Sequence, residues 1–158
     1  MTAPVRGSTS PDPLPRLAPG TRAWFEMVGR VVCDTAGSVG LPADLDLSMV
    51  ERYSDGAPLP DGPEHLVQGI RIDVVAGRAS FRVGVGAHET ADVTVVVTAD
   101  GARRLNGLVV GDPAHAATRE ALLRSGELRV EGDPSPLAAV LAGAHDPIVD
   151  RTLPAAAR

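Results

Sequence analysis

Apolar and polar residues alternate along two neighbouring segments in the middle of the chain. In residues 68–76, Ile and Val alternate with charged or small side chains, and residues 78–86 repeat the pattern with Ala, Phe and Val. A period of two residues predicts strands with one buried face and one solvated face. Ala76 and Gly77 join the two segments, which predicts a tight hairpin. Residues 91–99 predict a further strand of the same type.

A helical period comes before these strands. In residues 20–36, apolar residues recur at positions i, i+4 and i+7 from Trp24, which predicts a helix with one apolar face. Gly37 and Gly40 are expected to end this helix. A weaker alternation in residues 46–53 predicts a strand ahead of the hairpin. The residues on its apolar face are Leu47, Met49 and Tyr53.

The second half of the chain changes to helical patterns. Residues 100–106 predict a short helix. Asp112 is expected to cap a second helix, because an acidic side chain there accepts from the first free backbone N–H groups. Pro113 suits the first helical position, and the helix is expected to run to Ser125 and to end at Gly126.

A short strand and a last helix complete the pattern. Residues 127–131 predict the strand, after which Ser135 is expected to cap a helix that begins at Pro136. The apolar stripe of this helix is made by Leu137, Val140, Leu141 and Ala144. Residues 1–19 contain five prolines and predict a disordered tail, and residues 151–158 predict a second tail.

The order of these elements predicts an α+β fold in one domain over residues 20–150. We expect a five-stranded, mainly antiparallel sheet covered by helices on one face. The helical link between the fourth and fifth strands is long enough for a crossover connection.

Composition excludes several classes of function. The 15 basic residues are all Arg, and the absence of Lys excludes a Walker A phosphate loop and a Schiff-base mechanism. The net charge of -5 argues against nucleic acid as a partner. No apolar stretch approaches the roughly 20 residues of a membrane span, and the N-terminus lacks the apolar core of a signal peptide. We therefore expect a cytoplasmic protein without stable membrane insertion.

The cysteine and the histidines do not follow a known catalytic or metal-binding spacing. Cys33 stands alone in an apolar helical run, where a buried structural thiol is expected. The four histidines lack the paired spacing of a metal site. They are His65, His88, His115 and His145.

Several acidic residues and histidines leave two interpretations open. His88, Glu89 and Asp92 form either an acid/base cluster or an exposed connection between strands. Asp112 and His115 are either a metal-binding or catalytic pair, or a helix cap followed by a surface residue.

Two further positions are open in the same way. Glu26 and Asp34 share a face of the first helix, where they either meet a ligand inside a cavity or remain solvated. His145 is expected just after the last helix, where the helix dipole stabilises it. We therefore assign no catalytic residue, no metal and no cofactor from the sequence.

Taken together, several motifs over residues 46–144 resemble the sterol carrier protein 2 family. The matching positions are Asp92-Val93-Thr94, Asp100, Leu105 with Gly107, and Ser125-Gly126-Glu127-Leu128 followed by Val130, Gly132 and Asp133. The resemblance implies a five-stranded sheet covered by helices around an apolar cavity. It also implies that the chain binds or transfers a sterol, a fatty acyl chain or another lipid without a cofactor.

Apolar pockets of this kind contain few polar groups. The residues that we expect to line the cavity are Trp24, Phe25, Leu105, Leu108, Leu122, Leu123, Leu128, Leu137, Val140 and Leu141.

Three functional hypotheses follow. The first is a carrier of a hydrophobic small molecule such as a sterol, a fatty acyl chain or a polyketide-like molecule. The second is a cofactor-independent enzyme of the cyclase or isomerase type in a bacterial pathway, which an inward-facing Glu26, Asp34, His88 or His115 would favour. The third is an accessory module that forms a homodimer or binds another partner.

Overall fold

The computed structural model describes residues 12–60 and 62–156. Within them the chain forms four α-helices, five strands and a short 3-10 helix, η1. In chain order these are α1 (Arg22–Val39), β1 (Leu47–Tyr53), β2 (Leu66–Val75), β3 (Arg78–Gly86), β4 (Val93–Val97), α2 (Ala99–Leu105), α3 (Pro113–Ser125), β5 (Leu128–Glu131), η1 (Ser135–Leu137) and α4 (Ala138–Asp150).

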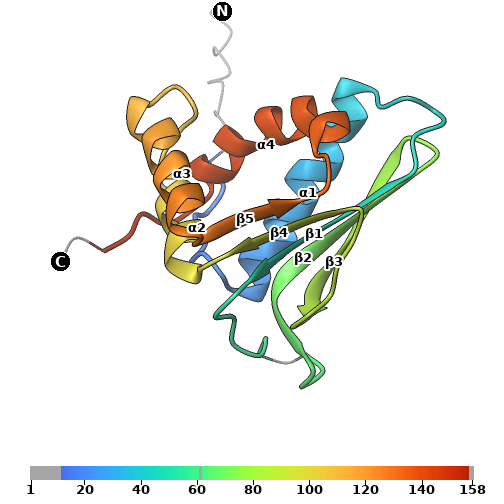
Figure 1. Ribbon diagram of the computed structural model, residues 1–158. Coiled ribbons are helices and arrows are strands. Elements are labelled where there is room, and N and C mark those ends of the chain that lie inside the picture. Colours follow the sequence, from blue (N-terminus) through green and yellow to red (C-terminus); the bar gives the residue numbers. More distant parts are fainter. Residues whose placement is uncertain (1–11, 61, 157–158) are drawn as a thin grey trace, which may run out of the picture.

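The strands of the described residues form one sheet in the order β3-β2-β1-β4-β5. The helices gather on one face of this sheet (Figure 1). β1 pairs with β4 in parallel, and the other neighbouring strands are antiparallel. The expected α+β fold with a five-stranded, mainly antiparallel sheet is therefore confirmed for the described residues.

The helical link between the fourth and fifth strands is long enough for a crossover connection but does not form one. β4 and β5 are antiparallel neighbours, so α2 and α3 form an excursion over the sheet between them. The parallel pair is instead β1 and β4, which the β2–β3 hairpin separates in the sequence. The hydrophobic pattern did not predict the order of the strands in the sheet. It shows which face of a strand is buried, but not which other strand lies beside it.

The predicted hairpin between β2 and β3 is present. Ala76 and Gly77 have φ angles of 49° and 73°, which suit a two-residue turn whose central residues both need positive φ. A side chain at Gly77 would also collide with the Pro42 carbonyl oxygen, which lies 2.5 Å from the position that a Cβ would take. Gly77 is therefore required by both its conformation and its surroundings.

The predicted boundaries of α3 agree with the structure, whereas those of α1 and α4 differ. Asp112 caps α3 by accepting from the Ala114 N–H at 2.8 Å. α1 continues through Gly37 and ends at Gly40, whose φ of 75° closes the helix.

The prediction for the last helix is wrong at both ends. Ser135 does not cap it, because the Ser135 hydroxyl donates to Asp133 at 2.6 Å. α4 also passes through Pro147 and ends at Asp150, so His145 lies inside the helix instead of after it. Ile148 is 7% exposed, and its packing in the core holds the turn that contains the proline.

Aromatic residues of α1 and β1 pack against one another in the core. The Phe25 ring lies 5.1 Å from the Trp24 ring and 5.5 Å from the Tyr53 ring. Trp24 also donates through Nε1 to the Thr152 hydroxyl at 2.8 Å, and this hydroxyl donates to the Ile148 carbonyl at 2.7 Å. The segment after α4 is thereby attached to α1.

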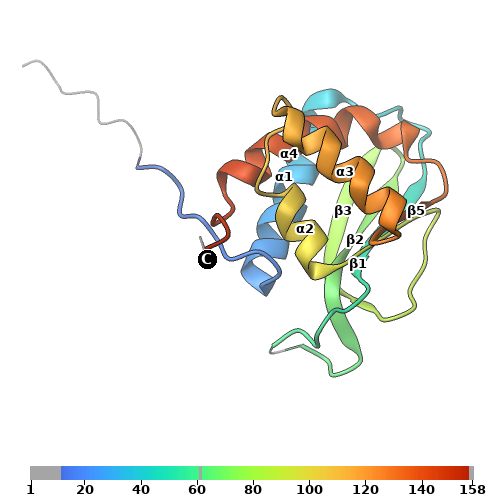
Figure 2. The same cartoon turned by 60° about the vertical axis from the view of Figure 1, so that its left-hand side comes forward.

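The two terminal segments of the described chain lie side by side (Figure 2). The Leu17 N–H donates to the Arg151 carbonyl at 2.8 Å, and the Leu153 N–H donates to the Leu17 carbonyl at 2.9 Å. Residues 1–11 of the expected N-terminal tail lie outside the described residues.

Candidate ligand pocket

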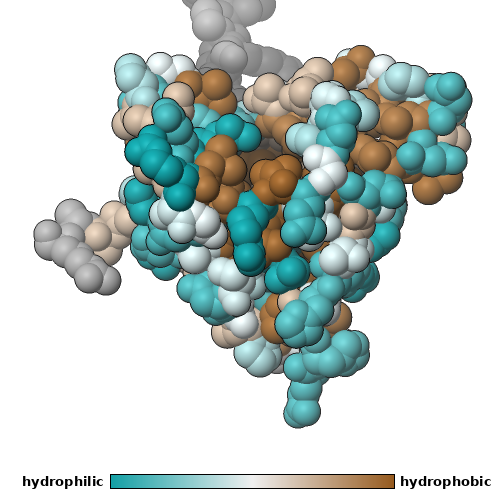
Figure 3. All heavy atoms as spheres, in the orientation of Figure 1, coloured by the Kyte–Doolittle hydropathy of each residue, from teal (hydrophilic) through white to brown (hydrophobic). Residues whose placement is uncertain are grey.

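A pocket of about 380 Å³ lies between the sheet and the helices α3 and α4. α3 packs against α2 and β5, whereas α4 packs against α1. This difference in partners separates α3 from α4 and leaves space above the strands. Figure 3 shows apolar side chains inside the hollow between these helices, with hydrophilic side chains around it. The volume falls within the roughly 300–1,000 Å³ range of small-molecule sites.

The walls of the pocket are mainly apolar. The sheet contributes a floor from four neighbouring strands, because the pleat of each strand turns alternate side chains toward the helices. The apolar floor residues are Met49, Ile70, Ile72, Val95, Val97, Leu128 and Val130. The helices and the connection before α3 add Trp24, Val28, Val32, Ala102, Leu105, Val110, Leu141, Ala142, Ala144 and Ile148.

Some of the residues expected to line a cavity meet at this pocket. Trp24, Leu105, Leu128 and Leu141 are on its wall. Phe25, Leu122, Leu137 and Val140 are buried in the core and are not wall residues. Leu108 is half-buried off the wall, and Leu123 is 39% exposed. A helical period identifies buried residues, but it does not tell which of them face empty space.

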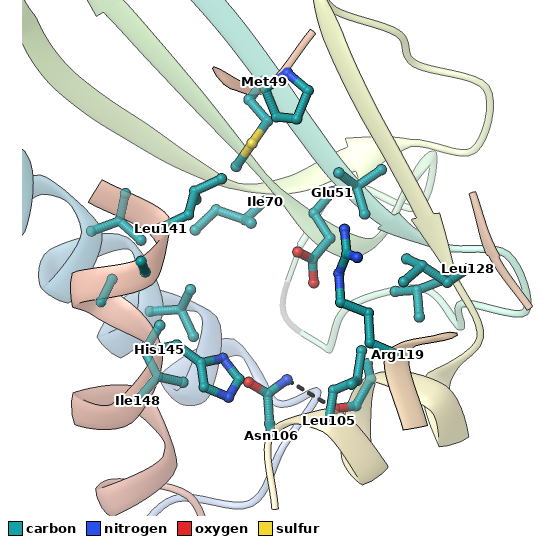
Figure 4. A pocket seen from close by; sticks show the side chains of 18 of the residues that line it. Met49, Glu51, Ile70, Leu105, Asn106, Arg119, Leu128, Leu141, His145 and Ile148 are labelled. Carbon is teal, nitrogen blue, oxygen red and sulfur yellow. Dashed lines mark hydrogen bonds between the residues drawn. The ribbon is translucent and has the colours of Figure 1, made fainter. Parts of the chain in front are cut away.

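Glu51 is the polar residue that the sequence analysis did not consider. It lies on β1 between Met49 and Tyr53 on the same face of the strand, and it lines the floor of the pocket. The alternation of residues 47–53 contained this signal, since a carboxylate interrupts the apolar face there. Figure 4 shows the Glu51 carboxyl group directed into the pocket.

The environment of Glu51 favours its neutral form. Its side chain makes no ion pair or hydrogen bond with any other described residue, and its remaining exposure is toward the pocket. Desolvation by burial raises the pKa of the Glu51 carboxyl group. Burial, followed by the nearby charge of Glu51, also raises the pKa of the Tyr53 hydroxyl, which therefore stays protonated.

Two histidines close one end of the pocket. The rings of His115 on α3 and His145 on α4 lie 4.6 Å apart at 62° to one another. His145 Nε2 lies 2.8 Å from the Leu108 carbonyl, and the Val110 N–H donates to Asp146 at 2.8 Å. α4 therefore holds the connection between α2 and α3 in place.

The pKa of His115 is lowered. Desolvation by burial is the main cause, and the positive charges that His145 and Arg119 can carry act in the same direction. His115 thus favours the neutral imidazole at neutral pH. Asn106 and Arg119 also line the pocket, and Figure 4 shows the guanidinium group of Arg119 directed into it.

The other sequence candidates lie away from this pocket. Glu26 is half-buried, and Asp34 and His88 are exposed; none of the three is a wall residue. Glu89 is held by Arg71 at 3.2 Å and by a short contact with Arg82.

Of the two interpretations of His88, Glu89 and Asp92, the structure agrees with a connection between strands and not with an acid/base cluster. Arg71 and Arg82 alternate with the inward-facing residues of their strands, so Glu89 binds the sheet face opposite the helices. Asp92 instead accepts from the Ser48 N–H and hydroxyl, both at 2.8 Å. The two acidic residues organise the connection between β3 and β4.

Three further observations concern the described part of the chain. Within it, no group of three or more His, Cys, Asp or Glu side chains is placed to hold a metal ion. None of its helices combines the length and the apolar character needed to cross a membrane. Cys33 is half-buried rather than fully buried, and burial raises the pKa of its thiol.

No protein-family model and no curated protein sequence matches the chain. Among solved structures, a sterol carrier protein 2 is 16% identical, with a TM-score of 0.49 over 84% of this chain and 96% of the other. A hypothetical protein from Thermus thermophilus, named a possible sterol carrier protein, is 14% identical, with a TM-score of 0.47 over 91% and 97%. Sterol carrier protein 2 like 2 from Aedes aegypti is 23% identical, with a TM-score of 0.39 over 77% and 95%. These proteins bear the name of the family that the sequence resembles.

Proposed function

We propose that this protein binds an apolar small molecule in the pocket between the sheet, α3 and α4. The observation that carries the proposal is an apolar space of about 380 Å³ that the side chains leave open. Protein interiors normally pack to the density of organic crystals and leave few voids larger than a water molecule. Water gains little in an apolar cavity, whereas an apolar solute gains from contact with the walls.

The ligand classes that we propose are a sterol, a fatty acyl chain and a polyketide-like molecule. All three bury a large apolar surface, and apolar burial contributes roughly 25 cal/mol per Å². Binding needs no cofactor in this proposal, because the walls and the solvent supply the driving force. The proposed role is that of a carrier that releases its ligand unchanged.

A cofactor-independent isomerase or cyclase is the second candidate. The observation that favours it is that the Glu51 carboxyl group and the His115 imidazole both line this pocket. A neutral carboxyl group can give a proton and a neutral imidazole can accept one, provided that both reach the reacting atoms. Recovery of the bound molecule discriminates the two roles: a carrier returns it unchanged, whereas an isomerase returns an isomer.

Filling the pocket tests the proposed function. Val130→Phe places a ring into the pocket from the floor, whereas Val75→Phe places the same ring on a residue that is 64% exposed. Protein purified from its own host would be measured by native mass spectrometry and then extracted under denaturing conditions. We expect a bound apolar compound in the wild type and in Val75→Phe, and a loss of at least about tenfold in Val130→Phe.

The opposite result is equally clear. Equal occupancy in Val130→Phe and Val75→Phe would place the ligand outside this pocket. Wild-type protein that carries no compound, and that also fails to take up added cholesterol, palmitate or decan-1-ol, would overturn the proposed function.

A further inference from the structure

Glu51 occupies the middle of the pocket floor. Its strand β1 is the third of the ordered strands, and Glu51 lies opposite Ile70 on β2 and Val95 on β4. Both neighbours are apolar pocket residues. The carboxyl group is therefore surrounded in the plane of the sheet by hydrocarbon and faces the empty space above it (Figure 4).

A carboxyl group in this position lacks a partner within the described chain. The Glu51 side chain is half-buried, and its carboxyl oxygens reach the space of the pocket, where water can contact them until a ligand displaces it. No described side chain or backbone group bonds to the carboxyl group of Glu51, although Arg119 also points into the pocket. The unused hydrogen-bonding capacity of Glu51 is directed at the place where the ligand would lie.

We propose that Glu51 is a specificity-determining residue that hydrogen-bonds a hydroxyl or carbonyl oxygen of the ligand. The ligand class is then an apolar molecule with an oxygen function, bound with that oxygen at the floor of the pocket instead of at its mouth. This inference rests on the proposed function, since it concerns the same pocket.

The protonation state of Glu51 fits this role. A neutral carboxyl group has one O–H donor and further acceptor capacity, so it pairs with an alcohol in either direction and donates to a carbonyl. Desolvation, which raises the pKa of Glu51, favours this neutral form. The other ionisable groups on the pocket wall are His115 and Arg119 from α3 and His145 from α4.

Two probes of equal length separate hydrogen bonding from apolar contact. Decan-1-ol and undecane each contain eleven non-hydrogen atoms, and only the alcohol can bond to Glu51. Equilibrium dialysis followed by mass spectrometric quantitation gives a dissociation constant for each. The quantity to compare between proteins is the ratio of the two constants, because the apolar contribution largely cancels in it.

Four variants are compared with the wild type: Glu51→Leu, Glu51→Gln, Met49→Leu and Arg119→Gln. Glu51→Leu is expected to weaken the binding of decan-1-ol by about tenfold relative to that of undecane. This factor corresponds to about 1.4 kcal/mol. Glu51→Gln retains a donor and an acceptor and is expected to keep the wild-type ratio. Met49→Leu, on the same wall, is expected to change both constants alike.

Each alternative outcome points to a different failure. A ratio that is the same in the wild type and in Glu51→Leu overturns the subsite while leaving the apolar pocket in place. A ratio that instead changes in Arg119→Gln places the oxygen near α3 and also overturns it. Failure of both probes to bind the wild type overturns the proposed function, and the subsite with it.

Discussion

The imidazole rings of His115 and His145 meet edge to face at 4.6 Å and join two helices that otherwise pack on different partners. His145 Nε2 also lies 2.8 Å from the Leu108 carbonyl, so the contact holds the connection that precedes α3 as well. The distance between α3 and α4 at this end of the pocket therefore depends on the contact between these two imidazole rings.

The first prediction concerns the pH dependence of this contact. The pKa of His115 in the folded protein is lowered from its ordinary value of 6.5, mainly by burial. As the pH falls below 6.5, the unfolded chain takes up this proton first, so stability decreases. The neighbouring charges are those of His145, Arg119, Asp146 and Asp112.

Thermal unfolding between pH 5 and pH 7.5 measures this effect. Below pH 6.5, we expect the stability of His115→Gln to decrease less than that of the wild type. His88→Gln, which alters an exposed histidine, serves as the control and should follow the wild type. Parallel curves for all three proteins would contradict the prediction.

The second prediction concerns the effect of Glu51 ionisation on the stability of the folded protein. The folded-state pKa of Glu51 is raised from its ordinary value of 4.5 by desolvation. Below pH 4.5 the carboxyl group is protonated in both states, and above it the unfolded chain ionises first, so the folded state loses stability as the pH rises. Glu51→Gln should therefore gain stability over the wild type at pH 7 and have little advantage at pH 4. Urea denaturation at the two pH values measures this difference, and an advantage that is larger at pH 4 would refute it.

The third prediction concerns the contact between α1 and β3. A Cβ at Gly29 would overlap the ring of Phe81, so a side chain there requires the ring or the helix to shift. We expect Gly29→Ala to reduce the free energy of unfolding by about 1–3 kcal/mol, as overpacking does in other cores. Gly37→Ala is the matched control, because its Cβ would meet nothing within 4 Å. That change should stabilise the helix by about 0.5–1 kcal/mol; equal effects would show that Gly29 has no packing role.

The fourth prediction concerns the attachment of the C-terminal segment. Thr152→Val leaves the buried Nε1–H of Trp24 without its acceptor at 2.8 Å. An unsatisfied buried donor costs about 1–3 kcal/mol, which chemical denaturation resolves. Thr152→Ser keeps the hydroxyl and should lose much less. Since valine keeps the γ-methyl group and replaces only the hydroxyl, unchanged stability in Thr152→Val would show that this hydrogen bond does not stabilise the fold.

Much of the local structure could be predicted from the chain itself. The alternation in residues 68–86 predicted a hairpin because the pleat of a strand separates its two faces whatever the surrounding fold. The boundaries of α3 followed from Asp112 and Gly126, because a cap depends on only a few neighbouring backbone groups. Ser135 was misassigned because Asp133, two residues earlier, accepts from both its N–H and its hydroxyl.

The pocket was decided by tertiary structure. Trp24 and Phe25 are adjacent in the same helix, yet the first lines the pocket and the second is fully buried. Glu51 lies on the pocket floor because β1 pairs with β2 and β4. His115 and His145 are in contact although 30 positions separate them in the sequence. Periodicity gives the face on which a side chain lies, but the space that this face encloses depends on how far separate elements stand apart. The sequence therefore determined the elements and their apolar faces, whereas the separation of α3 from α4 determined where the pocket lies.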